Sequence, residues 1–294
     1  MELIKAKTLL SAYRSNSDWF GHHYNLNIYK GCSHGCIYCD SRSDCYRIEN
    51  FDEVRAKDQA LLTLEKELKS KRKKGVIGSG AMSDPYNPQE AFALLTRGSL
   101  LLIDKYEYGI SLTTKSTLIE RDLDVLIRIR KHSPVLVLMT ITTADDGLAS
   151  VIEPHSSSTS QRFETLRKIS AAQIPTGILL MPILPWINDT SENIRDIIVK
   201  ANACGVKYIY PAFGVTLRQN QREYYFEQLD RHFPGLRDKY VRAYGERYVC
   251  ESPRAGVLSE LFEKECRRLG ILTKMSSIIQ DYQSGFKDEQ LKLF

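Results

Sequence analysis

Three of the seven cysteines in this 294-residue chain lie within eight residues, at Cys32, Cys36 and Cys39, with the spacing Cx3Cx2C. Three thiolates on one short loop can bind three irons of a four-iron cluster and leave the fourth iron open to a small molecule. A zinc site completed by His34 or a distant residue is the alternative. Zinc loops usually pair two CxxC-like elements, and no second such pair is present, because Cys204, Cys250 and Cys266 are isolated. The spacing therefore favours a cluster.

Composition indicates an ordinary water-soluble globular protein. The chain is 43% hydrophobic and 26% charged, with a formal net charge of +5, so charge alone does not select a substrate. No apolar run is long enough to cross a membrane, and the first twenty residues lack the apolar core of a signal peptide. We therefore expect a cytoplasmic protein without a membrane partner, in which clustered thiols serve metal binding or catalysis.

Extended and helical patterns alternate along the chain, which predicts parallel β/α units. About six strands are expected, so the prediction is an α/β fold built as a partial (β/α)6 TIM-like barrel. Residues 1–24 would form an N-terminal extension, 25–215 the barrel, and 216–294 a helical and irregular C-terminal extension packed on it. Expected strands cover 27–29, 76–80, 109–115, 134–143, 176–184 and 207–215, and expected helices cover 58–71, 91–106, 118–129, 161–173 and 191–205.

Polar residues follow the predicted strands, where β/α barrels place their active sites. The cysteine loop follows the first strand, Ser83 and Asp84 follow the second, and Lys115 ends the third. Thr140 and Thr142 end the fourth strand, on the face opposite Met139 and Ile141, and would point into the barrel mouth.

Two motifs resemble a known family. The stretch "KGCSHGCIYCD" resembles the cluster loop of the radical S-adenosylmethionine (SAM) superfamily, with Tyr38 directly before the third cysteine. Together with "MSDPYNPQE" it resembles the spore photoproduct lyase-like branch, which is related to DNA repair photolyases; the resemblance covers about residues 25–215. It implies a [4Fe-4S] cluster and SAM as cofactors.

The resemblance also implies roles for individual residues. Cys32, Cys36 and Cys39 would bind iron, and Tyr38 would present backbone groups to the adenine. The remaining SAM contacts would be Ser83 and Asp84 at the methionyl end, Lys115 at the carboxylate, and Thr140 and Thr142 at the ribose.

Structural interpretations stand beside these roles. Ser83 and Asp84 also suit a turn, Lys115 a strand end and the threonines a β-strand. Arg162 is expected on a helix surface rather than at a ligand. Glu153 and Pro154 could equally end a helix or contact SAM. Cys45 is expected to be a structural thiol beside the cluster loop.

The family reaction is reductive cleavage of SAM to a 5′-deoxyadenosyl radical that abstracts hydrogen from a substrate C–H. The resemblance implies a one-electron donor such as flavodoxin or ferredoxin, and we expect a monomer. The substrate stays open: a spore photoproduct-like lesion in nucleic acid, or RNA, a peptide or a small metabolite. A non-catalytic, zinc-stabilised nucleic-acid-binding module is the alternative outside enzymes.

This sequence departs from the family at one informative place. Spore photoproduct lyase has a cysteine hydrogen donor just before the Ser-Asp pair, whereas this chain has Gly80, Ala81 and Met82. The C-terminal third contains Arg and Tyr residues that could bind a nucleic acid by charge and stacking. Acidic residues are interleaved with them and would form ion pairs with the arginines instead. We expect no useful repair of spore photoproduct and weak binding of duplex DNA.

Overall fold

A seven-stranded sheet forms the centre of the molecule in the computed structural model, which describes residues 1–13 and 19–286. Six adjacent strands are parallel, and the seventh, β2, joins the edge antiparallel to β3. The predicted α/β fold with a partial barrel of six strands is therefore confirmed. The strands are, in sheet order, β10 (Tyr208–Pro211), β9 (Thr176–Leu180), β8 (Val135–Thr140), β7 (Gly109–Thr114), β6 (Val76–Ser79), β3 (Tyr24–Leu26) and β2 (Leu10–Ala12).

The strands form where apolar, largely β-branched runs can be buried on both faces, as parallel sheets require. Every residue of β8 is buried. On β7, Ile110 and Leu112 pack in the core between sheet and helices. The residues that alternate with them, Ser111 and Thr113, therefore face the barrel interior. This alternation places small polar side chains inside the barrel.

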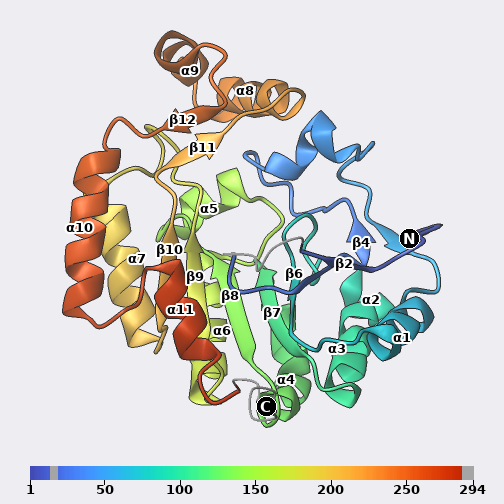
Figure 1. Cartoon of the computed structure of the whole chain (residues 1–294). Coiled ribbons are helices and arrows are strands. Elements are labelled where there is room, and N and C mark those ends of the chain that lie inside the picture. Colours follow the sequence, from blue (N-terminus) through green and yellow to red (C-terminus); the bar gives the residue numbers. More distant parts are fainter. Residues whose placement is uncertain (14–18, 287–294) are drawn as a thin grey trace.

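Helices cover the outer face of the sheet (Figure 1). They are amphipathic, with buried residues recurring every three or four positions, as Leu64 and Leu68 do in α1. The barrel helices are α1 (Ala60–Ser70), α2 (Glu90–Ala93), α3 (Leu95–Lys105), α4 (Leu123–Arg130), α5 (Asp146–Ile152), α6 (Thr159–Ala171) and α7 (Ser191–Ala203). Short 3-10 helices lie at η1 (Asp40–Arg42), η2 (Asp44–Tyr46) and η3 (Thr117–Asp122).

Four expected elements differ in the structure. The strand expected at 207–215 is divided into β10 and β11 (Gly214–Thr216), which belong to different sheets, and the first part of the helix expected at 118–129 is the 3-10 helix η3. The first strand was expected at 27–29, but β3 is Tyr24–Leu26, and Tyr29 belongs to a small separate sheet. Apolar and polar residues alternate from Tyr24 to Ile28, so the pattern does not fix where the strand ends, and pairing with β6 selects Tyr24–Leu26. The helix expected over 91–106 is broken at Leu94, which has φ +55°. The small sheet contains β1 (Glu2–Ile4), β5 (Arg55–Lys57) and β4 (Tyr29–Lys30).

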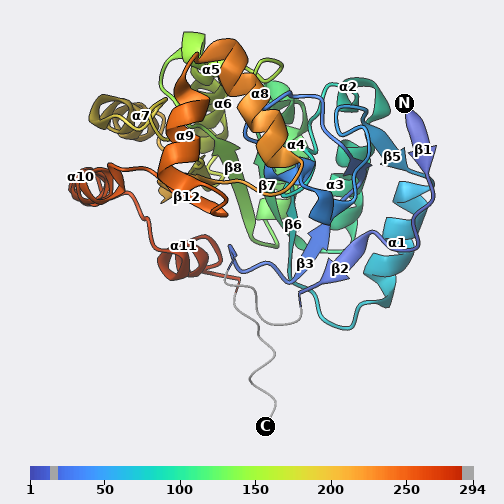
Figure 2. The same cartoon turned by 90° about the horizontal axis from the view of Figure 1, so that it is seen from above.

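The C-terminal part packs on the barrel from two directions (Figures 1 and 2). One portion lies above the carboxyl ends of the strands, beside the segment that follows the cysteine loop, and the other lies along the side of the barrel. Residues 14–18 and 287–294 of the two predicted extensions lie outside the described residues. The first portion has β11 (Gly214–Thr216), β12 (Val249–Glu251), α8 (Gln221–His232) and α9 (Leu236–Tyr244), and the second has α10 (Ala255–Arg268) and α11 (Met275–Tyr282).

The side of the barrel between β10 and β3 is filled by residues near the N-terminus. The sheet does not close there in the described part of the chain. Trp19 and Phe20 make edge-to-face contacts with Tyr210 of β10. Tyr282 of α11 is buried and donates a hydrogen bond to the Phe20 carbonyl. Among the described helices, none is long and apolar enough to span a membrane.

Candidate active site

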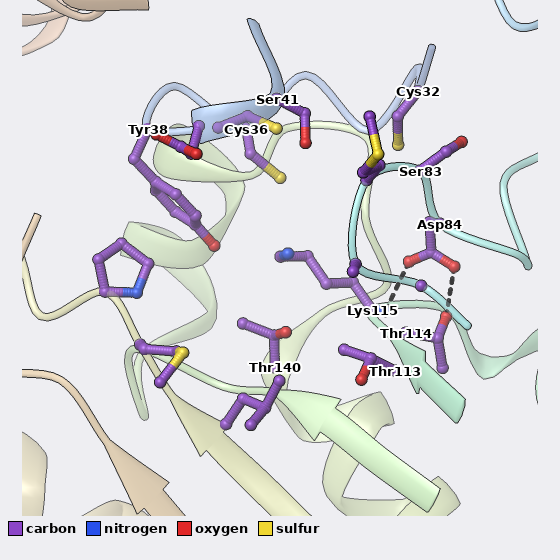
Figure 3. A pocket seen from close by; sticks show the side chains of 18 of the residues that line it. Cys32, Cys36, Tyr38, Ser41, Ser83, Asp84, Thr113, Thr114, Lys115 and Thr140 are labelled. Atoms are coloured by element: carbon purple, nitrogen blue, oxygen red, sulfur yellow. Dashed lines mark hydrogen bonds between the residues drawn. The ribbon is translucent and has the colours of Figure 1, made fainter. Parts of the chain in front are cut away.

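A cavity of about 430 Å³ opens at the carboxyl ends of the central strands (Figure 3). It collects side chains from loops that are far apart in the sequence, including the cysteine loop and the ends of β6, β7 and β8. Of the residues expected at the site, eight line this cavity: Cys32, Cys36, Tyr38, Cys39, Ser83, Asp84, Lys115 and Thr140.

The three loop thiols are free and face this common cavity. Burial is the main reason that the pKa values of Cys32 and Cys36 rise to about 12 and that of Cys39 to about 11. No three His, Cys, Asp or Glu side chains of residues 1–13 and 19–286 are placed to hold a single metal ion. Metal binding has to displace these thiol protons, since thiolates are the ligands.

Hydrogen bonds fasten the cysteine loop to the strand ends. Ser83 donates to the Gly31 carbonyl, directly before Cys32. His34 is buried inside the loop, with Nε2 3.2 Å from Asp84 Oδ2 and Nδ1 3.1 Å from the His155 carbonyl. The loop is therefore held on two sides, which fixes where the thiols point.

Asp84 is engaged by the protein itself. Its Oδ1 accepts hydrogen bonds from the Thr114 hydroxyl (2.7 Å) and the Tyr86 amide (2.9 Å), and its Oδ2 accepts one from the Lys115 amide (2.8 Å). Figure 3 shows the carboxylate turned toward the end of β7. Burial alone would raise the pKa of Asp84, but His34 and these donors lower it to about 2. The carboxylate is thus a charged anchor that joins the cysteine loop to β7.

A buried ion pair behind Tyr38 was missed in the sequence. Arg162 was expected on a helix surface, but it is 1% exposed, and its Nη2 lies 2.5 Å from Glu153 Oε2. The Tyr38 hydroxyl donates to the other Glu153 oxygen, and Arg162 also donates to the Thr140 carbonyl (2.8 Å). Burial would raise the pKa of Glu153, but Arg162 and Lys115 hold it below its usual value. The ion pair thus holds two residues that line the cavity, Tyr38 and Thr140, in place.

Lys115 extends into the middle of the cavity (Figure 3). Its Nζ lies 5.7 Å from the centre of the Tyr38 ring, and no carboxylate of the described residues lies within ion-pair distance of it. Burial would lower the pKa of Lys115, but Cys36 and Glu153 raise it above its usual value. The cavity therefore contains a positive charge that no carboxylate neutralises directly.

The two threonines of the fourth strand lie in different places. Thr140 lines the cavity, whereas Thr142 is buried outside its lining. The Thr142 carbonyl accepts hydrogen bonds from the side chains of Asn188 and Asn193. We expected both threonines in the barrel mouth because side chains alternate between the two faces of a strand. However, β8 ends at Thr140, so this alternation does not extend to Thr142.

A sequence model of the Radical SAM superfamily matches residues 26–198, which is more than half of the chain. The chain belongs to the radical SAM superfamily. It is therefore an enzyme of that superfamily and not a non-catalytic, zinc-stabilised binding module.

Sequence relatives of this radical SAM protein occur in bacteria and archaea. An uncharacterized Mycobacterium tuberculosis protein is 27% identical over 228 residues, covering 75% of this chain and 67% of the relative. An uncharacterized Methanocaldococcus jannaschii protein is 33% identical over 176 residues, covering 60% of this chain and 66% of the relative.

Solved structures share the radical SAM fold. Spore photoproduct lyase complexed with dinucleoside spore photoproduct superposes with a TM-score of 0.65 at 15% identity, covering 92% of this chain and 81% of that chain. The radical SAM methyltransferase TsrM of Kitasatospora setae has a TM-score of 0.53 at 12% identity, covering 83% and 51%. These similarities establish the fold.

A polar cluster at the cavity mouth of this radical SAM protein was also missed in the sequence. Asp40 and Tyr46 line the cavity, and the Tyr46 hydroxyl donates to Asp40 Oδ2 at 2.8 Å. Arg218 lies 3.6 Å from Asp40 Oδ1 and donates to the exposed Cys45 thiol at 3.0 Å. The cluster joins the segment after the cysteine loop to the C-terminal extension, and Cys45 takes part in that contact.

Proposed function

We propose that Cys32, Cys36 and Cys39 hold a [4Fe-4S] cluster and that the adjoining cavity binds SAM. The observation that carries the proposal is that three free thiols of one loop face the same cavity as the unneutralised Lys115 ammonium. When bound, these cofactors supply a 5′-deoxyadenosyl radical that abstracts hydrogen from a substrate C–H.

The residues present fit these groups. Three thiolates bind three irons and leave one coordination site for SAM. Lys115 offers a mobile positive charge for the SAM carboxylate. Thr140 has a hydroxyl in reach of the cavity for the ribose, and Ser83 and Asp84 position the cysteine loop rather than offering free groups. Tyr38 forms the wall beneath Lys115.

The proposed reaction acts on a substrate other than spore photoproduct. Among the described residues that line the cavity, the thiols are those of Cys32, Cys36 and Cys39, and none of Gly80, Ala81 and Met82 before the Ser-Asp pair has a thiol. A product radical would therefore meet no cysteine donor beyond the cluster ligands. RNA, a peptide or a small metabolite remain the candidate substrates. We propose a flavodoxin or ferredoxin as electron donor, a monomer, and a cytoplasmic location.

Cluster loading and SAM cleavage test this proposal. Anaerobically reconstituted protein should hold about four irons per chain and, with dithionite and SAM, slowly release 5′-deoxyadenosine. Cys32→Ala, Cys36→Ala and Cys39→Ala should each lose both iron and SAM cleavage. Cys45→Ala and Cys250→Ala are matched controls that should keep wild-type iron content. Loss of iron in Cys45→Ala, or full iron in a variant of the three loop cysteines, would contradict the assignment.

A further inference from the structure

A row of inward-facing residues crosses three adjacent strands below the cysteine loop. Asn25 of β3 pairs in register with Gly78 of β6, and Gly78 pairs with Ser111 of β7. Their neighbours along the strands, such as Ile77 and Ile110, pack in the outer core between sheet and helices. Asn25, Gly78 and Ser111 therefore face the barrel interior, and the first two line the cavity.

His22 covers the glycine in the middle of this row. A Cβ atom at Gly78 would lie 2.2 Å from His22 Nδ1, so the imidazole lies directly on the glycine backbone. The ring is stacked against Phe20, with ring centres 6.2 Å apart, and it also lines the cavity. Glycine at position 78 thus makes room for a histidine inside the barrel.

Two buried polar atoms around Gly78 have no hydrogen-bond partner among the described residues. They are Nε2 of His22, which is 5% exposed, and Oγ of Ser111, which is 1% exposed. Buried polar atoms are nearly always hydrogen-bonded, because an unpaired one costs about 1–3 kcal/mol. Two such atoms lie on either side of one glycine that lines the cavity. Their position indicates that a bound ligand supplies the missing hydrogen-bond partners.

The charged groups of the cavity lie elsewhere. Asp40, Asp84 and Lys115, which line it, all come from segments beyond the strand ends. Burial, aided by the neighbouring His23, lowers the pKa of His22 to about 4, so its imidazole is neutral at pH 7. The row therefore offers neutral groups: an amide, a hydroxyl and an imidazole.

We propose that Asn25, His22 and Ser111 form a substrate subsite that hydrogen-bonds an uncharged amide or lactam group. An amide presents one N–H donor and one carbonyl acceptor close together. The carbonyl accepts from the Ser111 hydroxyl or the Asn25 amide, and the N–H donates to neutral imidazole or to the Asn25 carbonyl oxygen. A charged group would lose its hydration there without a counter-charge. This inference rests on the proposed function, because it assigns the substrate class of the same cavity.

Binding of three small probes to the reconstituted protein with SAM tests this subsite. The probes are 2-pyrrolidone, cyclopentanone, which lacks the N–H, and pyrrolidine, which is a cation at pH 7. NMR titration should show saturable binding of 2-pyrrolidone, about fivefold or more tighter than cyclopentanone, and no saturable binding of pyrrolidine. A soaked crystal should place the lactam between His22 and Ser111.

Variants locate the binding. Asn25→Leu and Ser111→Ala should each weaken 2-pyrrolidone binding about fivefold, the effect of one lost neutral hydrogen bond. Ser99→Ala is the matched control, because the Ser99 hydroxyl is also buried without a described partner but belongs to helix α3 and not to the strands around Gly78; this variant should bind 2-pyrrolidone like wild type. Absent binding, equal binding of cyclopentanone, unchanged binding in both variants, or a water that stays between His22 and Ser111 in the soaked crystal would each overturn the proposal.

Wild-type SAM cleavage, measured in parallel without probe, separates this inference from the proposed function. Lactam binding by a protein that does not cleave SAM would keep the subsite but remove its role in radical chemistry. SAM cleavage without lactam binding would keep the proposed function and overturn the subsite.

Discussion

Lys115 has the charge and position of a ligand-binding residue. It lies in the cavity beside the Tyr38 ring, and no described carboxylate is within ion-pair distance. Lys115→Met keeps the length of the side chain and removes the charge. We expect SAM binding to weaken by about 1–3 kcal/mol, the range for a hydrogen bond to a charged group. Anaerobic calorimetry of reconstituted protein measures it, with Lys105→Met on the exposed face of α3 as control. Wild-type affinity in Lys115→Met would remove this residue from the site.

The Glu153–Arg162 pair should matter more to stability than its surface counterparts. Both side chains are almost fully buried, so Glu153→Gln leaves an uncompensated guanidinium. We expect the free energy of unfolding to fall by about 3 kcal/mol or more, and the Glu153→Gln/Arg162→Met double variant to lose less than the two single variants together. Urea denaturation measures this. Glu164→Gln, from the exposed pair with Arg167 on the same helix, should leave the midpoint unchanged. Strict additivity would show that the pair is not coupled.

The burial of Arg162 could have been predicted, but only in part. The buried side chains of α6 include Thr159, Arg162, Leu166 and Ile169, which recur every three or four residues, so the helical stripe passes through the arginine. What the pattern cannot supply is the partner. Glu153 lies in the preceding loop, and its pairing with Tyr38 and Arg162 depends on how this loop, the cysteine loop and α6 meet in space. That Cys32, Cys36 and Cys39 lie together at one cavity was predictable, because their spacing in the sequence is local.

Glu90 organises the break between two helices. It is fully buried at the start of α2, and its carboxylate accepts hydrogen bonds from the backbone amides of Thr96 (2.9 Å) and Arg97 (3.3 Å) in the first turn of α3. The same carboxylate lies 2.7 Å from Arg121 and accepts from the Tyr29 hydroxyl. A carboxylate at a helix N-terminus is stabilised by the free amides and the helix dipole.

Replacing Glu90 should therefore weaken this junction. We expect Glu90→Gln to lower the free energy of unfolding by about 2–3 kcal/mol, because Arg121 loses a buried partner. Thermal or urea unfolding checks this, and Gln89→Ala, at the exposed neighbouring position, is the control with little expected effect. A Glu90→Gln protein as stable as wild type would show that the amides and Arg121 find other partners.

Element types were more predictable than element ends. Five of the six barrel strands were located because buried parallel strands are short apolar runs bounded by turns. The first strand and the break at Leu94 were missed for a shared reason. Both depend on partners distant in sequence, namely β6 for the first strand and the Tyr29–Glu90–Arg121 contacts for the break. Such tertiary contacts override local propensity.

At the scale of the whole molecule, some side chains of the C-terminal extension that could contact a nucleic acid are buried inside the protein. Tyr225 and Tyr240, candidates for stacking on bases, are fully buried against each other and the extension's core. Arg222 is buried and donates to the carbonyls of Gly245 and Arg247. These side chains hold α8 to the segment before β12. Because Arg222, Tyr225 and Tyr240 make contacts within the protein, they are not free to bind a nucleic acid.

We therefore predict that the enzyme does not repair spore photoproduct at a useful rate and binds duplex DNA weakly at physiological salt. Repair would require the lesion to be flipped out of the duplex, with phosphate contacts to supply affinity, and the arginine and tyrosines above are not available for them. The product radical would also need a hydrogen donor, and Gly80, Ala81 and Met82, which precede the Ser-Asp pair, include no cysteine. The test is to incubate reduced enzyme with SAM and dinucleoside spore photoproduct and to assay the repaired dinucleoside. Authentic spore photoproduct lyase serves as the positive control. Many turnovers by the wild-type protein would contradict the prediction, while repair by Ala81→Cys alone would identify the missing thiol as the reason.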